Sequence, residues 1–201
     1  MLRTDEAFSR AIEAKVAAIE ARSSAELVVV AAGRSGSYRE LPIVSGLVGS
    51  WLCLAFLCWA PWPFDPWWFP LDIGLGGLLF AWLGHRFSPG MVRHLLSPER
   101  RRRQVREAAE AAFFQESVHA TAGRTGLLVY VSAMEEEVVL LPDHGLTGRI
   151  PGATWNALAV EAHDLPALEA GMDRLGELLA EHLPRSADDQ NELPDAPRLR
   201  P

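Results

Sequence analysis

The chain has 201 residues, of which 49% are hydrophobic and 22% are charged, and its formal net charge at pH 7 is −7. A chain of this length holds one domain of ordinary size and one further segment, which excludes an array of several domains. The excess of acidic residues also argues against a chain-wide attraction to nucleic acid.

Residues 1–40 carry the pattern of a helix, a strand and a loop. The first 22 residues are charged and amphipathic, unlike a cleaved signal peptide, and Thr4 is a suitable N-cap. Helical spacing places four apolar side chains on one face: Phe8, Ile12, Val16 and Ile19. The run 25–32 (AELVVVAA) lacks alternation, which predicts a strand covered on both faces, and 33–38 (GRSGSY) predicts a loop.

Residues 41–87 have the composition of a membrane hairpin. From 41 to 84 the only charges are Asp65 and Asp72, and the first arm, 41–60, is a run of 20 uncharged residues. A bilayer core of about 30 Å needs about 20 helical residues, so this arm is expected to span. The second arm is weaker, because its clean run, 71–84, has only 14 residues. To cross the bilayer this arm must recruit Trp67–Phe69 and His85–Phe87; otherwise it tilts, stays short or is re-entrant.

The two arms carry small residues at four-residue spacing, which lets helices approach closely in lipid. The pairs are Ser45 with Gly49, Gly46 with Ser50, and Gly77 with Ala81. Either these residues form the contact between the arms, or they reflect how common glycine is in membrane helices. Four prolines break the helix between the arms: Pro61, Pro63, Pro66 and Pro70.

Arginines gather immediately after the hairpin. Between Arg86 and Arg106 there are seven arginines against one acid, Glu99. Basic flanks mark the cytoplasmic side, so we expect an inner-membrane protein that crosses twice with both termini in the cytoplasm. Ser97 and Pro98 begin a helix that reaches to about 117, and its dipole disfavours the arginines in its first turns. A partner should compensate, and anionic lipid headgroups fit the membrane-facing group Arg100, Arg101, Arg102 and Arg103.

The remainder predicts two strands, two helices and a tail. The apolar runs 126–133 and 137–141 are separated by a short connection, which predicts an antiparallel pair, whereas the first two strands should be parallel because a helix joins them. Helices are expected at 154–163 and 165–183, the latter capped by Asp164. The polar, proline-rich segment 184–201 is expected to be disordered.

Polar residues follow or precede the predicted strands, and such strand ends collect ligands in open α/β sheets. The candidates are Glu26, Arg124, Thr125, Asp143 and His144. The alternative for Asp143 is a turn aspartate, and for His144 a solvated loop histidine. The six histidines show no metal-binding pair at helical spacing, and no Walker loop, dinucleotide fingerprint or nucleophile elbow is present in the sequence.

Several blocks together resemble bacterial membrane members of the TPM-domain family. They are SSAELVVVAAGRSGSYRE (Ser23–Glu40), the Phe-Asp-Pro tip (Phe64–Pro66), GRTGLLVYVSAMEEEVVLLPDHGL (Gly123–Leu146) and NELPDAPR (Asn191–Arg198). The resemblance implies an α/β fold with a small mixed sheet sandwiched by helices, and here with an inserted two-helix transmembrane hairpin. It also implies a division into 1–40 and 97–183 for the domain, 41–87 for the hairpin and 184–201 for the tail.

Members of that wider family are associated with acid phosphatase activity, divalent cation binding, photosystem repair and receptor modulation. Phosphatase-like members carry an acidic pair before the second strand, where this chain has Arg124 and Thr125, and Gly-Tyr-Gly after the third, where it has Asp143, His144 and Gly145. The missing acidic pair removes ligands that a hard cation prefers, which argues against metal-dependent phosphate chemistry.

The leading interpretation is therefore a TPM-like domain anchored at the cytoplasmic face of the membrane, which acts as a binding or accessory module and not as an enzyme. Its expected partners are the lipid bilayer and another membrane or membrane-associated protein, and not nucleic acid. The alternative is a phosphatase-like hydrolase that uses Asp143, His144 and Glu26 with a divalent cation as cofactor.

Overall fold

The computed structural model describes residues 5–38, 40–62, 64–87, 97–158, 164–186, 188 and 191–200. The chain divides into two compact units, one formed by Met1–Gly36 with Pro98–Pro201 and the other by Ser37–Ser97. The first unit is therefore discontinuous in sequence, and the second unit is inserted into it.

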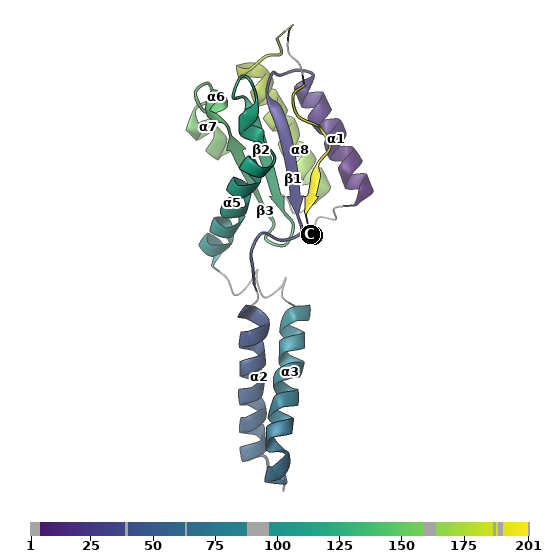
Figure 1. The fold of residues 1–201 in the computed structure, drawn as a ribbon, viewed down its shortest axis with the longest axis vertical. Helices are drawn as coiled ribbons and strands as arrows, with labels where there is room; N and C mark the ends of the chain where they lie inside the picture. Colours follow the sequence, from purple (N-terminus) through teal and green to yellow (C-terminus); the bar gives the residue numbers. More distant parts are fainter. Residues whose placement is uncertain are drawn as a thin grey trace. The chain divides into compact units, whose positions relative to one another are not determined.

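A four-stranded mixed sheet forms the centre of the first unit (Figure 1). Its strands are β1 (Glu26–Ala32), β2 (Gly126–Ser132), β3 (Glu137–Pro142) and β4 (Arg198–Arg200), in the order β3-β2-β1-β4. β1 is parallel to both β2 and β4, whereas β2 and β3 are antiparallel. The parallel and antiparallel pairings predicted for the first three strands are thus confirmed.

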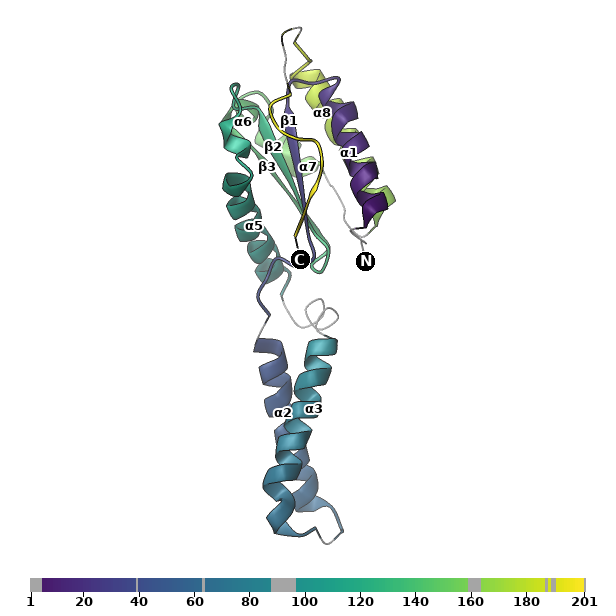
Figure 2. The ribbon, with the colours of Figure 1, turned by 45° about the vertical axis from the view of Figure 1, so that its right-hand side comes forward.

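Helices cover both faces of this sheet. The helices of this unit are α1 (Glu6–Glu20), α5 (Pro98–Gln115), α6 (His144–Thr147), α7 (Gly152–Ala157) and α8 (Leu165–His182). α1 and α8 lie side by side on one face, and α5 lies on the other (Figure 2). The α/β class with a mixed sheet between helices is confirmed.

Successive side chains of β1 point to opposite faces of the sheet, and this explains why there is one hydrophobic core on each face. Leu27, Val29 and Ala31 belong to the core with α1 and α8, whereas Val28 and Val30 belong to the core with α5. Every residue of β1 is buried, as its non-alternating apolar sequence predicts for a strand covered twice.

Aspartates cap the helices of the larger core. Asp5 caps α1 by accepting a hydrogen bond from Phe8 N at 3.0 Å. The sequence predicts Thr4 as this cap, and Thr4 lies outside the described residues. Asp164 caps α8 as predicted, and accepts from Ala167 N at 2.8 Å. The helix expected at 154–163 is the shorter α7, and residues 159–163 lie outside the described part of the chain.

The prediction of a disordered tail is wrong for the end of the chain. Residues 198–200 form β4, which extends the sheet by pairing with β1. The segment before β4 is held by side chains of the domain, among them Glu26 and Glu20. The composition of the tail predicts disorder because the segment has little apolar surface to bury. The groups that hold it are polar and lie far away in the sequence, so the composition of the tail does not reveal them.

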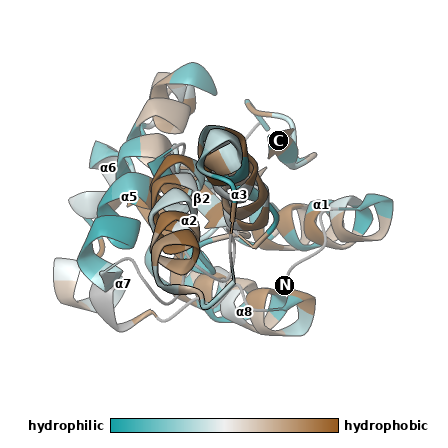
Figure 3. Ribbon diagram, turned by 90° about the horizontal axis from the view of Figure 1, so that it is seen from below, coloured by the Kyte–Doolittle hydropathy of each residue, from teal (hydrophilic) through white to brown (hydrophobic). Residues whose placement is uncertain are grey.

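The second unit is a helical hairpin of α2 (Glu40–Trp59), a short 3₁₀ turn (Pro66–Trp68) and α3 (Phe69–Arg86). Figure 3 shows both helices as largely hydrophobic. Within the described residues, α2 is the one helix long and apolar enough to cross a membrane, with 20 residues and a mean hydropathy of 2.0. α3 has 18 residues and includes Asp72 and Arg86.

Small residues do form the contact between α2 and α3, as one of the two interpretations of the sequence predicts. A Cβ atom built at Gly46 lies 3.2 Å from Ala81 Cβ, and one built at Gly77 lies 2.3 Å from Ser50 Oγ. One built at Gly49 lies 2.3 Å from Phe80 Cβ. The helices therefore approach too closely for larger side chains at these positions.

Candidate functional site

The polar residues predicted at strand ends lie at one edge of the sheet. Glu26 pairs in register with Gly126, and Leu127 pairs with Pro142, so the starts of β1 and β2 adjoin the end of β3. This is the amino end of the parallel strands, whereas ligands in open α/β sheets collect beyond the carboxyl ends. The expectation that these residues gather is right, but the edge is not the usual ligand-binding edge.

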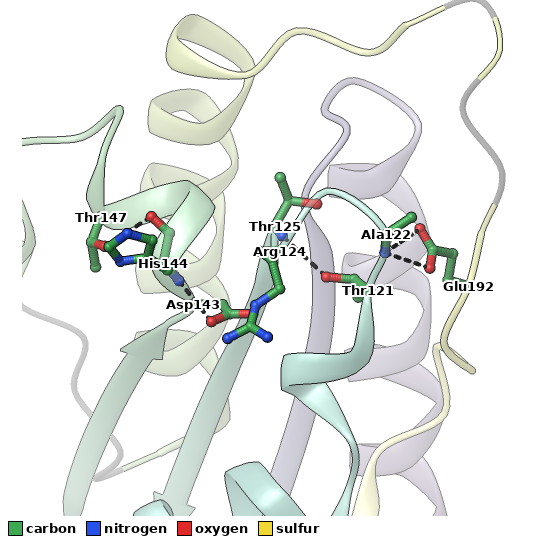
Figure 4. A network of polar contacts seen from close by, with 8 residues as sticks. All are labelled: Thr121, Ala122, Arg124, Thr125, Asp143, His144, Thr147 and Glu192. Atoms are coloured by element: carbon green, nitrogen blue, oxygen red, sulfur yellow. Dashed lines mark hydrogen bonds and ion pairs between the residues drawn. The ribbon is translucent and has the colours of Figure 1, made fainter.

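Asp143 is buried at this edge, and its two carboxylate oxygens meet different groups (Figure 4). Its Oδ1 atom accepts a hydrogen bond from His144 N at 2.7 Å, which caps α6, and its Oδ2 atom lies 2.9 Å from Arg124 Nε in an ion pair. Asp143 is thus a capping aspartate neutralised by an arginine. The positive charge of Arg124 beside it opposes a divalent cation at the same place.

The backbone brings Arg124 to this position through a close approach. Arg124 adopts a positive φ of 52°, and its carbonyl accepts a hydrogen bond from Gly145 N at 2.9 Å. A Cβ atom at Gly145 would lie 2.5 Å from Gly123 O and 2.6 Å from Arg124 O, so only glycine fits there. The close backbone contact between Arg124 and Gly145 therefore brings the side chains of Arg124 and Asp143 together.

His144 contributes its backbone to the edge. Its carbonyl oxygen accepts a hydrogen bond from Thr147 Oγ1 at 3.0 Å, and the residue is exposed to solvent. The alternative interpretation of a solvated loop histidine is thus right about the exposure but not about the loop, because His144 is the first residue of α6.

Glu26 faces a different neighbour from Asp143. Its Oε2 atom accepts hydrogen bonds from the backbone nitrogens of Glu192 at 3.2 Å and Leu193 at 3.1 Å. The structure thus gives the three proposed catalytic groups separate partners: Glu26 binds the C-terminal segment, Asp143 binds Arg124, and His144 begins α6.

An open pocket of about 680 Å³ lies at the same edge and includes Glu26, Thr125, Arg149 and Glu192 in its lining. Asp143 and His144 do not line it. Among the described residues, no group of three or more His, Cys, Asp or Glu side chains is arranged to hold a metal ion. The lining of the pocket includes carboxylates, an arginine and hydroxyl groups.

The arginines of α5 are partly compensated within the chain. Three of them form exposed ion pairs with acids of the same unit: Arg102 with Glu137 at 3.5 Å, Arg103 with Glu107 at 2.8 Å and Arg106 with Glu110 at 3.1 Å. The argument that a partner must balance the whole cluster is therefore wrong for Arg102 and Arg103. A role of this exposed basic surface at lipid headgroups stays a prediction.

Two buried carboxylates were missed by the sequence reasoning. Glu20 is 7% exposed, and burial raises its pKa to about 8. It follows Val16 by four residues on the apolar face of α1, and that spacing could have identified it. Glu135 is 1% exposed and accepts hydrogen bonds from Ser35 N, Gly36 N and Ser132 Oγ. Nothing in the run of three glutamates 135–137 singles it out.

Comparison with known proteins supports the fold. No family model and no curated protein matches the chain. The chain is similar to the NMR structure of the BA42 protein from the psychrophilic bacterium Bizionia argentinensis. The sequence identity is 15%, the match covers 97% of this chain and 94% of that one, and the TM-score is 0.57. At this identity the likeness concerns the fold alone.

Proposed function

We propose that this protein is a TPM-like binding or accessory module, anchored by its helical hairpin in the inner membrane of a bacterial cell. The hairpin crosses the bilayer twice, and both termini lie in the cytoplasm. The α/β unit binds another membrane or membrane-associated protein, and the arginines of α5 lie at anionic lipid headgroups.

The observation that carries this proposal is the outer surface of α2. Its large apolar side chains point away from α3, among them Ile43, Leu47 and Trp51, which are 63%, 61% and 74% exposed. Apolar surface of this extent is unfavourable in water and favourable in hydrocarbon. The backbone of a helix satisfies its own hydrogen bonds there.

The geometry of α3 supports a second crossing. Gly46, near the start of α2, meets Ala81, near the end of α3, and Ser50 meets Gly77, so the helices run antiparallel. An 18-residue helix is about 27 Å long, close to the thickness of the hydrocarbon core. α3 also exposes large apolar side chains, including Leu78 at 69% and Trp82 at 61%.

The ion pair between Arg124 and Asp143 favours binding over metal-dependent hydrolysis. In a metal-dependent hydrolase this carboxylate would hold the cation, whereas one oxygen of Asp143 caps a helix and the other lies in an ion pair with a guanidinium. The contacts of Glu26 are likewise with backbone nitrogens of its own chain.

Membrane topology is tested with single cysteines in a chain whose native Cys53 and Cys58 are both replaced by alanine. Trp67→Cys reports on the tip, and Ala14→Cys and Ala111→Cys report on exposed positions of α1 and α5. An impermeant maleimide applied to spheroplasts should label only Trp67→Cys, and all three positions after lysis. Labelling of Trp67→Cys together with only one of Ala14→Cys and Ala111→Cys in spheroplasts would overturn the two-pass anchor. Extraction of the protein by carbonate would also overturn it.

The binding role is tested with the purified full chain in detergent. We expect no hydrolysis of phosphomonoesters above the rate of a matched Asp143→Asn variant, with or without magnesium, calcium or manganese. A metal-dependent rate that is lost in Asp143→Asn, and retained in the control Asp164→Asn, would replace the binding role by the hydrolase alternative. Asp164 is the suitable control because it is also an aspartate at the start of a helix, where it caps α8 by accepting from Ala167 N.

A further inference from the structure

The C-terminal segment 191–200, here called the strap, lies along the open side of β1 (Figure 2). Its last three residues form β4, with Val30 opposite Arg198 and Ala32 opposite Arg200. Gly33 N donates a hydrogen bond to Arg200 O at 2.9 Å. The strap thus adds a strand to the sheet, which is the geometry of peptide recognition by β-augmentation.

Two carboxylates of the domain hold the strap at its two ends. Glu26 accepts from the backbone nitrogens of the first part of the strap, as described above. At the other end, Glu116 Oε1 lies 2.7 Å from Arg200 Nη2, and Glu116 Oε2 lies 3.3 Å from Arg198 Nε. Glu116, the residue directly after α5, therefore contacts two arginines that are two residues apart.

The strap also reaches into the domain with two side chains. The carboxylate of Glu192 accepts a hydrogen bond from Ala122 N at 2.9 Å and 3.2 Å, one distance for each oxygen (Figure 4). Leu193 packs against the core between β1 and α5. The side chains through which the strap contacts the domain therefore follow the pattern Glu-Leu, four further residues, and Arg-x-Arg.

The contacts of the strap are ones that another extended segment can make in its place. The strand it forms has three residues, and Arg198 and Arg200 keep part of their surface in water. Hydrogen bonds of this kind contribute about 1 kcal/mol each, because water replaces them when the segment leaves. An extended peptide with the same few groups would gain the same contacts.

We propose that the edge of β1 is a binding groove for an extended segment of a partner protein with the pattern Glu-Leu-x4-Arg-x-Arg, and that the strap fills this groove in competition with the partner. The inference rests on the proposed binding role, for which it supplies the class of partner. It does not depend on the number of membrane crossings.

The test uses the full chain in detergent, with a specific protease site inserted after Asp188. A fluorescent peptide of residues 188–200 is added before and after cleavage, and binding is followed by anisotropy. We expect the peptide to bind the cleaved chain at least tenfold more tightly than the uncut chain, in which the strap is tethered. A peptide that keeps only Glu, Leu and the two Arg, with alanine and threonine elsewhere, should compete within tenfold.

Matched variants locate the binding. Glu116→Gln should weaken binding of the peptide to the cleaved chain at least tenfold, whereas Glu110→Gln, which removes an exposed acid of α5, should leave it unchanged. Equal binding to cut and uncut protein, no exchange after cleavage, or failure of the reduced peptide to compete would each overturn the proposal. So would disulfide-linked dimers formed between one copy with Ala31→Cys and another with Leu199→Cys, because the occupant would then be a second copy. The topology experiment above is unaffected by any of these results.

Discussion

Arg124 Nε lies 2.9 Å from Asp143 Oδ2, and this ion pair joins the loop before β2 to the start of α6. Asp143 is 5% exposed, so the pair is sheltered on the carboxylate side, whereas the side chain of Arg124 is 57% exposed. Removing Asp143 therefore leaves the guanidinium in water, so its cost comes from the lost cap of α6, whereas removing Arg124 leaves a buried carboxylate without its counter-charge.

This asymmetry gives a first prediction. Asp143→Ala removes the cap of α6 and should lower the free energy of unfolding by about 1–2 kcal/mol, whereas Asp143→Asn keeps an oxygen for His144 N and should cost less. The measurement is pulse proteolysis in urea on the full chain in detergent. Equal losses in the two variants would contradict the role of Asp143 as a cap.

A second prediction concerns the buried carboxylate of Glu135. It accepts hydrogen bonds from Ser35 N at 3.2 Å and from Gly36 N at 3.1 Å, and it also binds Ser132 Oγ. Glu135→Ala leaves two backbone amides without this acceptor. We expect the free energy of unfolding to fall by about 3 kcal/mol and hydrogen exchange at residues 35 and 36 to become faster.

The control for Glu135 is Glu107→Ala on α5. Glu107 forms an exposed pair with Arg103 one helical turn away, so its removal should change stability by less than about 0.5 kcal/mol. If Glu135→Ala were as mild as this control, the carboxylate would not be what holds the segment 33–36.

A third prediction is a dependence of stability on pH through Glu20. Its Oε1 atom accepts a hydrogen bond from Leu27 N at 2.8 Å, but burial, the largest cause, raises its pKa from 4.5 to about 8. The folded chain therefore holds this proton between pH 4.5 and 8 while the unfolded chain releases it, so stability falls as pH rises through that window. The slope from this group is at most about 1.4 kcal/mol per pH unit.

Glu20→Gln separates this effect from other titrations. The glutamine keeps an acceptor for Leu27 N and carries no charge at any pH, so the variant should match the parent chain at about pH 4, below the unfolded pKa, and exceed it in stability at pH 8. Urea unfolding of both chains at the two pH values measures the difference. Parallel pH profiles would show that Glu20 is not the group responsible.

The layers of the α/β unit follow from local patterns, which is why sequence predicts them. The large apolar residues that recur at helical spacing are buried against the sheet: Phe8, Ile12, Val16 and Ile19 in α1, and Leu168, Met172, Leu175 and Leu179 in α8. β1 and β2 are mostly apolar, with Glu26 and Ser132 at their ends, and every residue of both strands is buried. In each of these elements the residues that decide the structure are neighbours in the chain.

The strap and the edge site depend instead on distant partners. Arg200 lies 84 residues from Glu116, and Glu192 lies 166 residues from Glu26, so no local pattern predicts either contact. The sequence does place Asp143 and Arg124 at adjoining strand ends. It cannot say that they neutralise each other, because that depends on the loop geometry around Gly145.

A fourth prediction tests the packing of the hairpin through two glycines. A Cβ atom at Gly49 would lie 2.3 Å from Phe80 Cβ, whereas one at Gly74 would meet nothing within 4 Å. Gly49→Ala should therefore push α2 and α3 apart, at a cost of about 1–3 kcal/mol for overpacking, and Gly74→Ala should be tolerated.

The separation of the helices can be measured as disulfide formation between Gly46→Cys and Ala81→Cys, in a chain with Cys53 and Cys58 replaced by alanine. A Cβ atom at Gly46 lies 3.2 Å from Ala81 Cβ, close to the Cβ separation of about 3.5–4.5 Å that a disulfide needs. Oxidation in membranes should therefore give a high yield of the internal crosslink in the chain with these two cysteines, both without further change and with Gly74→Ala added. Gly49→Ala should lower that yield severalfold, and an unchanged yield would mean that α2 and α3 do not pack through Gly49 in the bilayer.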